Sequence, residues 1–308
     1  MDLDIALRTI SPFLILMGLG FISRMKGVLR EGDEHVLNSF IYYFALPSFL
    51  VSSLSQVDFT KLGFGFIIAC LMPVLIAIII LYLFCMLFKF SMETFVLLVV
   101  CTVFGNLFFY GLPFILFGFP ESGSLATVSA SFISLLTIPM AIIFLELYSF
   151  HKDCGTRNFW RTVKGLLKNP VIVSVFFGTF LSLLKVPLPI FILNSLNLLG
   201  ATTVPLAVFL LGVFFYGRRY CKLVDGFKLS LLRMVLLPTL ALMIARFVSL
   251  SGMETAIVVI MHATPLATPM IVFSERYNFF KDIIASLLLI SSVLGGVYLN
   301  LWLLILGH

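Results

Sequence analysis

Two apolar stretches of the chain combine polar side chains with proline. They read GNLFFYGLP at 105–113 and HATPLATP at 262–269, and in each an Asn or a His lies seven residues before the final proline. Proline has no backbone N–H and interrupts helical hydrogen bonding, while lipid offers no water to replace the lost bond. Polar side chains at such a break can satisfy the freed backbone groups or hold a polar substrate.

These two stretches supply the candidate substrate-binding residues. Asn106 is interpreted either as a cap of the helix break or as a substrate contact. His262 is either a neutral ring bonded to freed carbonyls or an ionisable group with a function inside the membrane. The full set is Asn106, Tyr110, Gly111, Pro113, His262, Thr264, Thr268 and Pro269.

Nothing else in the sequence has the pattern of a chemical site. A nucleophile paired with a base, a phosphate-binding glycine loop and a cluster of metal ligands are all missing, and the five cysteines are scattered singly. We therefore expect no enzymatic activity, no metal and no cofactor. Arg233 and Glu146 are expected near the basic face of the membrane, where long side chains reach water, and they are not assigned to the site.

The composition is that of an integral membrane protein. The 308 residues are 61% hydrophobic and 11% charged, whereas about 25% of residues are charged in an average soluble domain. Apolar runs long enough to cross the hydrocarbon layer recur along the whole chain. Ten membrane-spanning helices are expected, at 5–23, 36–54, 63–88, 94–118, 125–148, 170–184, 190–216, 229–248, 255–274 and 283–306.

Basic residues concentrate in alternate loops between these expected spans. The formal net charge of +6 is therefore interpreted as a topology signal and not as a nucleic-acid surface. Because cytoplasmic loops are enriched in Lys and Arg, the loop at 149–169 is expected in the cytosol and both termini outside.

The two halves of the chain echo each other at a nearly fixed spacing. Pairs of residues 158 positions apart are Pro12 and Pro170, Gly20 and Gly178, and Pro47 and Pro205. The expected domains are a first five-helix repeat at 1–148, a basic cytosolic linker at 149–169 and a second repeat at 170–308. Because five is odd, the second repeat must be inverted, which is typical of secondary transporters with broken helices at the binding site.

At these residues the sequence resembles the auxin efflux carrier family, which includes plant PIN exporters and bacterial permeases for malonate, malate and similar anions. The resemblance covers essentially the whole chain. It is carried by LNSFIYYFALPSFL at 37–50, GNLFFYGLPFILFG at 105–118, NPVIVSVFFGTFL at 169–181, GATTVPLAVFLLG at 200–212 and TPLATPMIVFSERY at 264–277.

The resemblance implies an all-α membrane fold of two inverted five-helix repeats, related to the bile-acid sodium symporters and NhaA-type antiporters. Its fourth and ninth spans would cross at their breaks, with Asn106, Pro113 and Pro269 at the family's substrate positions. Spans 1, 2, 6 and 7 would form a scaffold that carries any homodimer contact, and spans 3, 4, 5, 8, 9 and 10 a mobile transport domain. The breaks lack the acidic residue that holds sodium in the bile-acid relatives.

We therefore expect a secondary transporter of a small organic anion, a carboxylate such as malate, malonate or an auxin-like acid. Elevator-type alternating access would carry it across a plasma membrane, in a bacterium the inner membrane. Helix N-termini favour anions without needing Lys or Arg. The expected partners are this substrate and membrane lipid, with no nucleic acid. The alternatives are a receptor or sensor on a transporter fold and a sodium or proton antiporter.

The topology makes a first prediction. Cys154 and Cys221 lie in loops expected on the cytosolic side, so a membrane-impermeant thiol reagent should label them in inverted vesicles and leave them unlabelled in intact cells. Labelling of either cysteine in intact cells, detected by peptide mass spectrometry, would overturn the expected number of spans.

Overall fold

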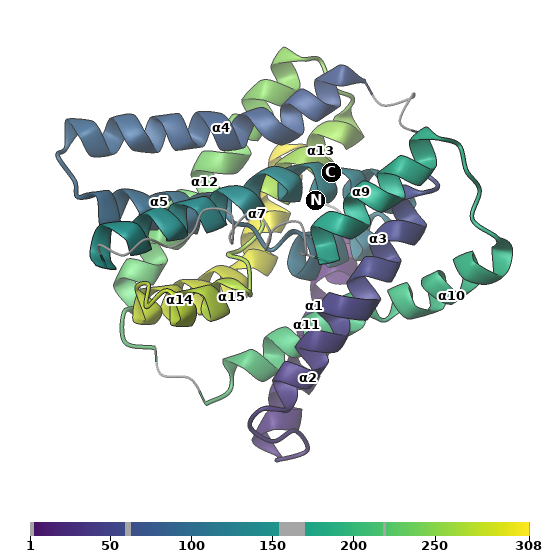
Figure 1. The fold of residues 1–308 in the computed structure, drawn as a ribbon, viewed down its shortest axis with the longest axis horizontal. Coiled ribbons are helices and arrows are strands. Elements are labelled where there is room, and N and C mark those ends of the chain that lie inside the picture. Colours follow the sequence, from purple (N-terminus) through teal and green to yellow (C-terminus); the bar gives the residue numbers. More distant parts are fainter. Residues whose placement is uncertain (1–2, 59–62, 154–169, 218–219, 308) are drawn as a thin grey trace. The chain divides into compact units, whose positions relative to one another are not determined.

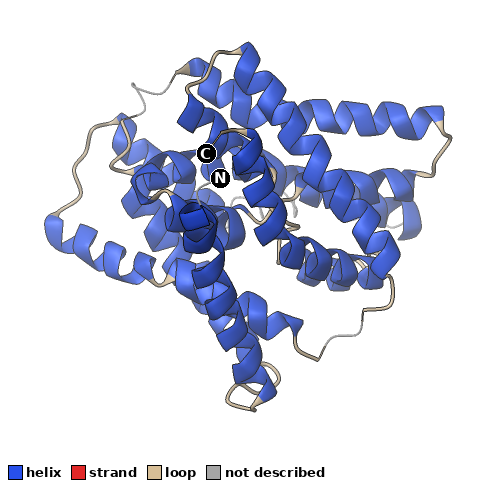
Figure 2. Cartoon of the chain, turned by 180° about the vertical axis from the view of Figure 1, so that it is seen from behind, coloured by secondary structure: helices blue, strands red, loops and turns tan. Residues whose placement is uncertain are grey.

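The computed structural model describes residues 3–58, 63–153, 170–217 and 220–307 (Figure 1). These ranges form helices and loops and contain no strand (Figure 2). Cys154 and most of the expected linker lie outside the described residues. The helices are α1 (Leu3–Met25), α2 (Asp33–Phe40), η1 (Ile41–Ala45), α3 (Leu46–Leu54), α4 (Phe64–Leu87), α5 (Met92–Val103), η3 (Leu107–Gly111), α6 (Leu112–Gly118), η4 (Pro120–Ser122), α7 (Gly123–Asp153), α9 (Pro170–Leu183), α10 (Ile190–Ala201), α11 (Thr203–Phe215), α12 (Leu223–Phe247), α13 (Gly252–His262), α14 (Met270–Arg276) and α15 (Lys281–Ile305).

Several helices have the length and composition of membrane spans. Within the described residues six helical segments qualify, namely Asp33–Leu54, Phe64–Leu87, Pro120–Ser149, Ile190–Phe215, Leu223–Phe247 and Lys281–Ile305. Shorter apolar helices accompany them, among them α5 and α13, which occupy the first halves of the expected spans 94–118 and 255–274. The chain is thus a multi-pass membrane protein, and the ten-span inverted repeat stays a prediction.

The described chain divides into two compact units, each built from three sequence segments. Unit 1 comprises 1–63, 108–131 and 165–218, and unit 2 comprises 64–107, 132–164 and 219–308. Helices α1 to α3, α6 and α9 to α11 belong to unit 1, whereas α4, α5 and α12 to α15 belong to unit 2. Both units therefore combine segments from the two halves of the chain.

In unit 1, helices pack backbone against backbone at glycines. A Cβ atom added to Gly20 of α1 would overlap the carbonyl oxygen of Phe209 on α11, and one added to Gly212 of α11 would overlap the carbonyl oxygen of Met17 on α1. Small residues allow such close approach between helices in lipid, where packing replaces the hydrophobic effect as the driving force. The glycines at 20 and 212 are therefore required by the contact between α1 and α11.

Unit 2 is built around a continuous apolar core. Its buried side chains come from α5, α7, α12, α14 and α15 and from the segments that follow α5, α13 and α14. The cluster consists of Val96, Leu97, Val100, Cys101, Phe104, Ala141, Leu145, Tyr148, Leu229, Leu266, Ala267, Met270, Ile271, Tyr277, Phe279, Ile284, Leu287 and Leu288. This packing holds the ends of α5 and α13 among the same neighbours.

The start of each interrupted helix is fixed by a serine cap. The Ser91 hydroxyl accepts a hydrogen bond from the Thr94 N–H at 3.3 Å, and Ser251 forms a capping box with Glu254. Such caps satisfy N–H groups that have no partner within the helix. From these caps α5 runs for 12 residues and α13 for 11, so both helices end about 17 Å from their starts.

The α1–α11 contact generates a second prediction. Gly212→Ala forces a Cβ into the backbone of α1, so the free energy of unfolding should fall by about 1–3 kcal/mol, the usual cost of overpacking. Thermal unfolding in detergent measures the change. Gly18→Ala is the matched control on α1, because its added Cβ would meet nothing within 4 Å. Equal melting temperatures for the two variants would contradict the close packing.

Candidate functional site

The segments that follow α5 and α13 pair with each other. Gly105 and Leu266 form an isolated antiparallel bridge. Its hydrogen bonds run from the N–H of Asn106 to the carbonyl oxygen of Pro265 (2.8 Å) and from the N–H of Ala267 to the carbonyl oxygen of Phe104 (3.0 Å). Backbone groups that leave a helix in an apolar interior must find other partners. Here each break supplies the partners of the other, which forms a crossover within unit 2.

Side chains from both breaks also meet at this crossover. The Asn106 side-chain amide donates to the hydroxyl oxygen of Thr268 at 3.0 Å, and both residues are 4% exposed. An amide and a hydroxyl together offer hydrogen-bond donors and acceptors to a ligand. The structure thus brings together two predicted site residues that are 162 positions apart in the sequence.

His262, the last residue of α13, contacts α4, a helix with Pro73 in its interior. Its Nε2 lies 3.1 Å from the carbonyl oxygen of Cys70, and the ring also interacts with the backbone of Ala69. Pro73 lacks the N–H that would bond the Ala69 carbonyl within the helix. Since a carbonyl can only accept, Nε2 carries the hydrogen. This geometry favours a ring bonded to freed carbonyls, and a substrate contact of His262 stays a prediction.

Arg233 lies in the interior of unit 2, and the expectation that it reaches the cytosolic face is wrong. It is 1% exposed. The expected span began at residue 229, but α12 begins at Leu223, which places Arg233 about 15 Å along the helix from its start. The position of Arg233 so far inside an apolar helix is the sequence signal that could have marked it as a site residue, because burying a charge in the membrane is energetically costly and such residues usually have a function.

The guanidinium of Arg233 binds the ends of both interrupted helices. Nη1 donates to the carbonyl oxygens of Thr102 and, at 3.4 Å, of Cys101 in the last turn of α5. Nε donates to the carbonyl oxygen of Thr264 at 2.6 Å, and Nη2 lies 3.4 Å from the hydroxyl of the same residue. Thr264, a predicted site residue just beyond the end of α13, is therefore a hydrogen-bond partner of Arg233.

Gly105 makes room for this guanidinium. A Cβ atom added to Gly105 would overlap Arg233 Nη2 and would lie 2.6 Å from Thr264 Oγ1. The glycine that begins the first break is therefore required by packing at the crossover and not only by backbone flexibility.

The remaining candidate residues divide between the two units. Pro269 directly precedes α14 in unit 2, whereas Tyr110, Gly111 and Pro113 belong to unit 1. Tyr110 is 1% exposed and lies in the π-helical turn η3, and Pro113 sits in the first turn of α6. The helix resumes before Pro113, so the interruption of the expected span lies at 104–106 and not at this proline.

Glu146, which was expected near the basic face, is half-buried and forms a contact inside unit 2. Its Oε1 accepts a hydrogen bond from the Tyr277 hydroxyl at 2.7 Å, and the pair is partly buried. The bond joins α7 to the segment after α14, next to the apolar core that carries the second break.

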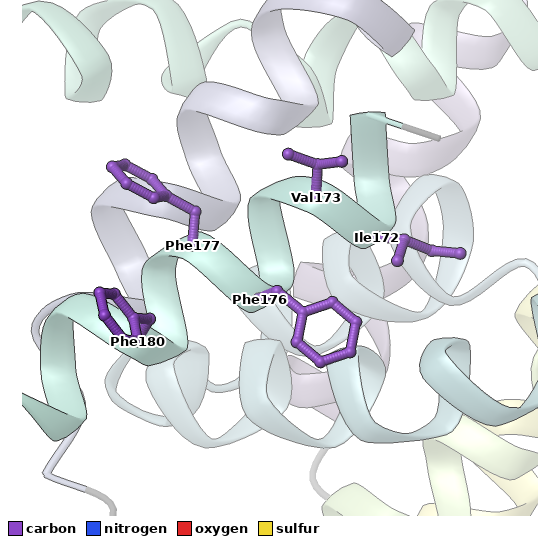
Figure 3. A pocket seen from close by; sticks show the side chains of 5 residues that line it. All are labelled: Ile172, Val173, Phe176, Phe177 and Phe180. Atoms are coloured by element: carbon purple, nitrogen blue, oxygen red, sulfur yellow. The ribbon is translucent and has the colours of Figure 1, made fainter. Parts of the chain in front are cut away.

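A surface pocket on α9 has none of the candidate residues in its lining. Figure 3 shows five apolar side chains of α9 that line it, namely Ile172, Val173, Phe176, Phe177 and Phe180. Phe176 is 62% exposed. An exposed apolar helix face of this kind suits lipid in a membrane protein and offers no polar group for an anion.

The crossover generates a third prediction. Gly105→Ala should displace the Arg233 guanidinium and lower the free energy of unfolding by about 1–3 kcal/mol, as overpacking does. Gly252→Ala in the same unit is the control, since its Cβ would meet nothing within 4 Å. Thermal unfolding compares them, and an unchanged Gly105→Ala variant would show that Arg233 does not occupy this space.

Comparison with known proteins assigns the chain to a family. The family described as membrane transport protein matches residues 5–151 and 156–303. An uncharacterized transporter of Methanocaldococcus jannaschii is 27% identical over 94% of this chain and 95% of its own length. One from Escherichia coli is 22% identical over 93% of this chain and 92% of its own. The expected family is confirmed, and the chain belongs to the auxin efflux carrier family of membrane transport proteins.

Proposed function

We propose that the protein is a secondary transporter of a small organic anion, a carboxylate such as malate, malonate or an auxin-like acid. The observation that carries this proposal is the crossover, in which two interrupted helices pair and bring Asn106 and Thr268 together. Broken helices with irregular backbone are the binding elements of inverted-repeat transporters. Membership in a membrane transport family supports the same function.

The chemistry of the crossover favours an anion. The Asn106 amide and the hydroxyl of Thr268 can donate hydrogen bonds to a carboxylate, and the buried guanidinium of Arg233 adds a positive charge beside them. Hydrogen bonds to a charged acceptor are stronger than those between neutral groups. A cation would find no carboxylate in either break to pair with.

The division into units supports elevator-type alternating access. Unit 1 contains the expected scaffold spans 1, 2, 6 and 7 together with the second half of expected span 4. Unit 2 contains the crossover of Asn106 and Thr268 with helices from the other six. A compact unit that carries the binding site can move as a body. Location in a plasma membrane with both termini outside, and a homodimer through the helices of unit 1, belong to the same proposal.

Flux measurement tests the function and provides a fourth prediction. Proteoliposomes should accumulate radiolabelled malonate, malate or indole-3-acetate. Thr268→Val removes a hydroxyl from the crossover and should raise the KM about 5- to 10-fold, the worth of one hydrogen bond. Thr137→Val is the matched control, because Thr137 is equally buried in unit 2 and its hydroxyl has no partner among the described residues.

The same experiment separates the alternatives. A protein that binds a labelled carboxylate without accumulating it would be a receptor or sensor. Sodium or proton flux that continues without any organic anion would indicate an antiporter. Equal KM values for Thr268→Val and Thr137→Val would remove Thr268 from the binding site.

A further inference from the structure

We propose that Arg233 is the positioning residue of the crossover. Its side chain ties the ends of α5 and α13 together and offsets their negative charge, and it does not touch the substrate. The sequence pattern and the family resemblance assigned no role to this residue. Its donors reach the carbonyls of Cys101 and Thr102 from one helix and that of Thr264 after the other. One side chain on α12 thereby joins two breaks that belong to different halves of the chain.

The ends of the two helices are negative. Aligned peptide dipoles place about half an elementary negative charge at the C-terminus of a helix, on carbonyls without a helical partner. Both α5 and α13 end at the crossover, so their combined charge is close to that of one carboxylate. The single positive charge of Arg233 offsets it, and these carbonyls explain why a fully buried arginine is tolerated.

The bridging geometry requires arginine. A guanidinium presents its N–H groups in a rigid planar fork, whereas the ammonium of lysine is a compact point charge. Here Nη1 bonds α5 while Nε bonds the segment after α13, and Nη2 faces both Thr264 Oγ1 and the space beside Gly105. Lysine would keep the charge but could not bond both ends in this arrangement.

The packing behind Arg233 holds it in this position. Trp302 of α15 donates its Nε1–H to the carbonyl oxygen of Met234 at 3.1 Å, which fixes α15 beside α12 next to the arginine. Tyr298 lies one turn before Trp302 and interacts electrostatically with Arg233. Its hydroxyl has no hydrogen-bond partner in the described part of the chain, so Tyr298→Phe is a matched control for a change near the guanidinium.

The functional consequence rests on the proposed function. An anion that approaches the crossover would be repelled by two negative helix ends if nothing offset them. Four of the five Arg233 N–H groups face protein carbonyls or the Thr264 hydroxyl. We therefore assign its contribution to anion binding to its positive charge and to the alignment of Asn106 with Thr268.

The first arm of the experiment does not depend on transport. Cys101 is 0% exposed at the crossover, Cys85 is buried elsewhere in unit 2, and Cys221 is exposed. N-ethylmaleimide labelling of the full chain in membranes is read by peptide mass spectrometry. Cys101 should be labelled at least about 10-fold faster in Arg233→Met, a few-fold faster in Arg233→Lys and unchanged in Tyr298→Phe, since a lysine ammonium cannot bridge both helix ends as the guanidinium does.

Cys85 reports whether the variants keep their fold. It should stay protected in all of them, while Cys221 is labelled in all. If Arg233→Met also exposes Cys85, the unit has unfolded and Arg233→Lys decides the question. Cys101 that is as protected in Arg233→Lys as in the wild type would then overturn the bridging role, as would an unchanged Arg233→Met.

The second arm tests the charge. Binding of malonate and its uncharged diamide, and of indole-3-acetate and its amide, is measured on purified protein. Arg233→Met should weaken carboxylate binding at least about 10-fold more than amide binding. Arg233→Lys should keep most of the carboxylate affinity, because lysine retains the positive charge, and should lose turnover, because it cannot bridge the two helix ends.

The outcomes of the two arms are separable. Equal losses for carboxylate and amide would overturn the electrostatic role. Loss of carboxylate binding in Arg233→Lys, with Cys101 still protected, would show that the guanidinium holds the carboxylate directly and would overturn the indirect role. A wild-type protein that binds none of the four probes would refute the proposed carboxylate function, while the labelling of Cys101 would still decide whether Arg233 joins the helices.

Discussion

The structure of unit 2 depends on one constraint, the need of buried backbone groups for hydrogen-bond partners. α5 and α13 both stop inside an apolar core, and each leaves carbonyl and N–H groups that lipid cannot satisfy. Two hydrogen bonds between the breaks satisfy part of this need, and Arg233 satisfies much of the rest. The crossover is therefore a consequence of where two helices end.

Neighbouring features follow from the same constraint. Gly105 has no side chain because the guanidinium fills that space, and His262 bonds a carbonyl of α4 beside the position where Pro73 removes an N–H. The serine caps at Ser91 and Ser251 fix the starts of α5 and α13. Because the two helices have nearly the same length, each ends at about the same distance from its own cap. The residue type at each of these positions is explained by a structural requirement, and the same requirement shapes the site.

The crossover leaves polar side-chain groups that a substrate can bind. Helix ends that have bonded each other need no water, while Asn106 and Thr268 still present an amide and a hydroxyl at the point of contact. The offset between a cationic guanidinium and two negative helix ends makes the crossover close to neutral. A nearly neutral site with directed donors can bind an anion and release it again, as a transport cycle requires.

The sequence by itself determined the membrane class, the family, the positions of most helices and the two breaks, because hydropathy, proline and capping residues act locally. It also named Asn106, Thr264 and Thr268 as candidate site residues, and all three lie at the crossover. Only the tertiary structure decided which backbone groups join the two breaks, that Thr264 binds Arg233, that Arg233 is buried and that Glu146 contacts Tyr277. Most of these outcomes depend on contacts between residues more than a hundred positions apart, and the burial of Arg233 depends on the length of α12. No local pattern encodes either.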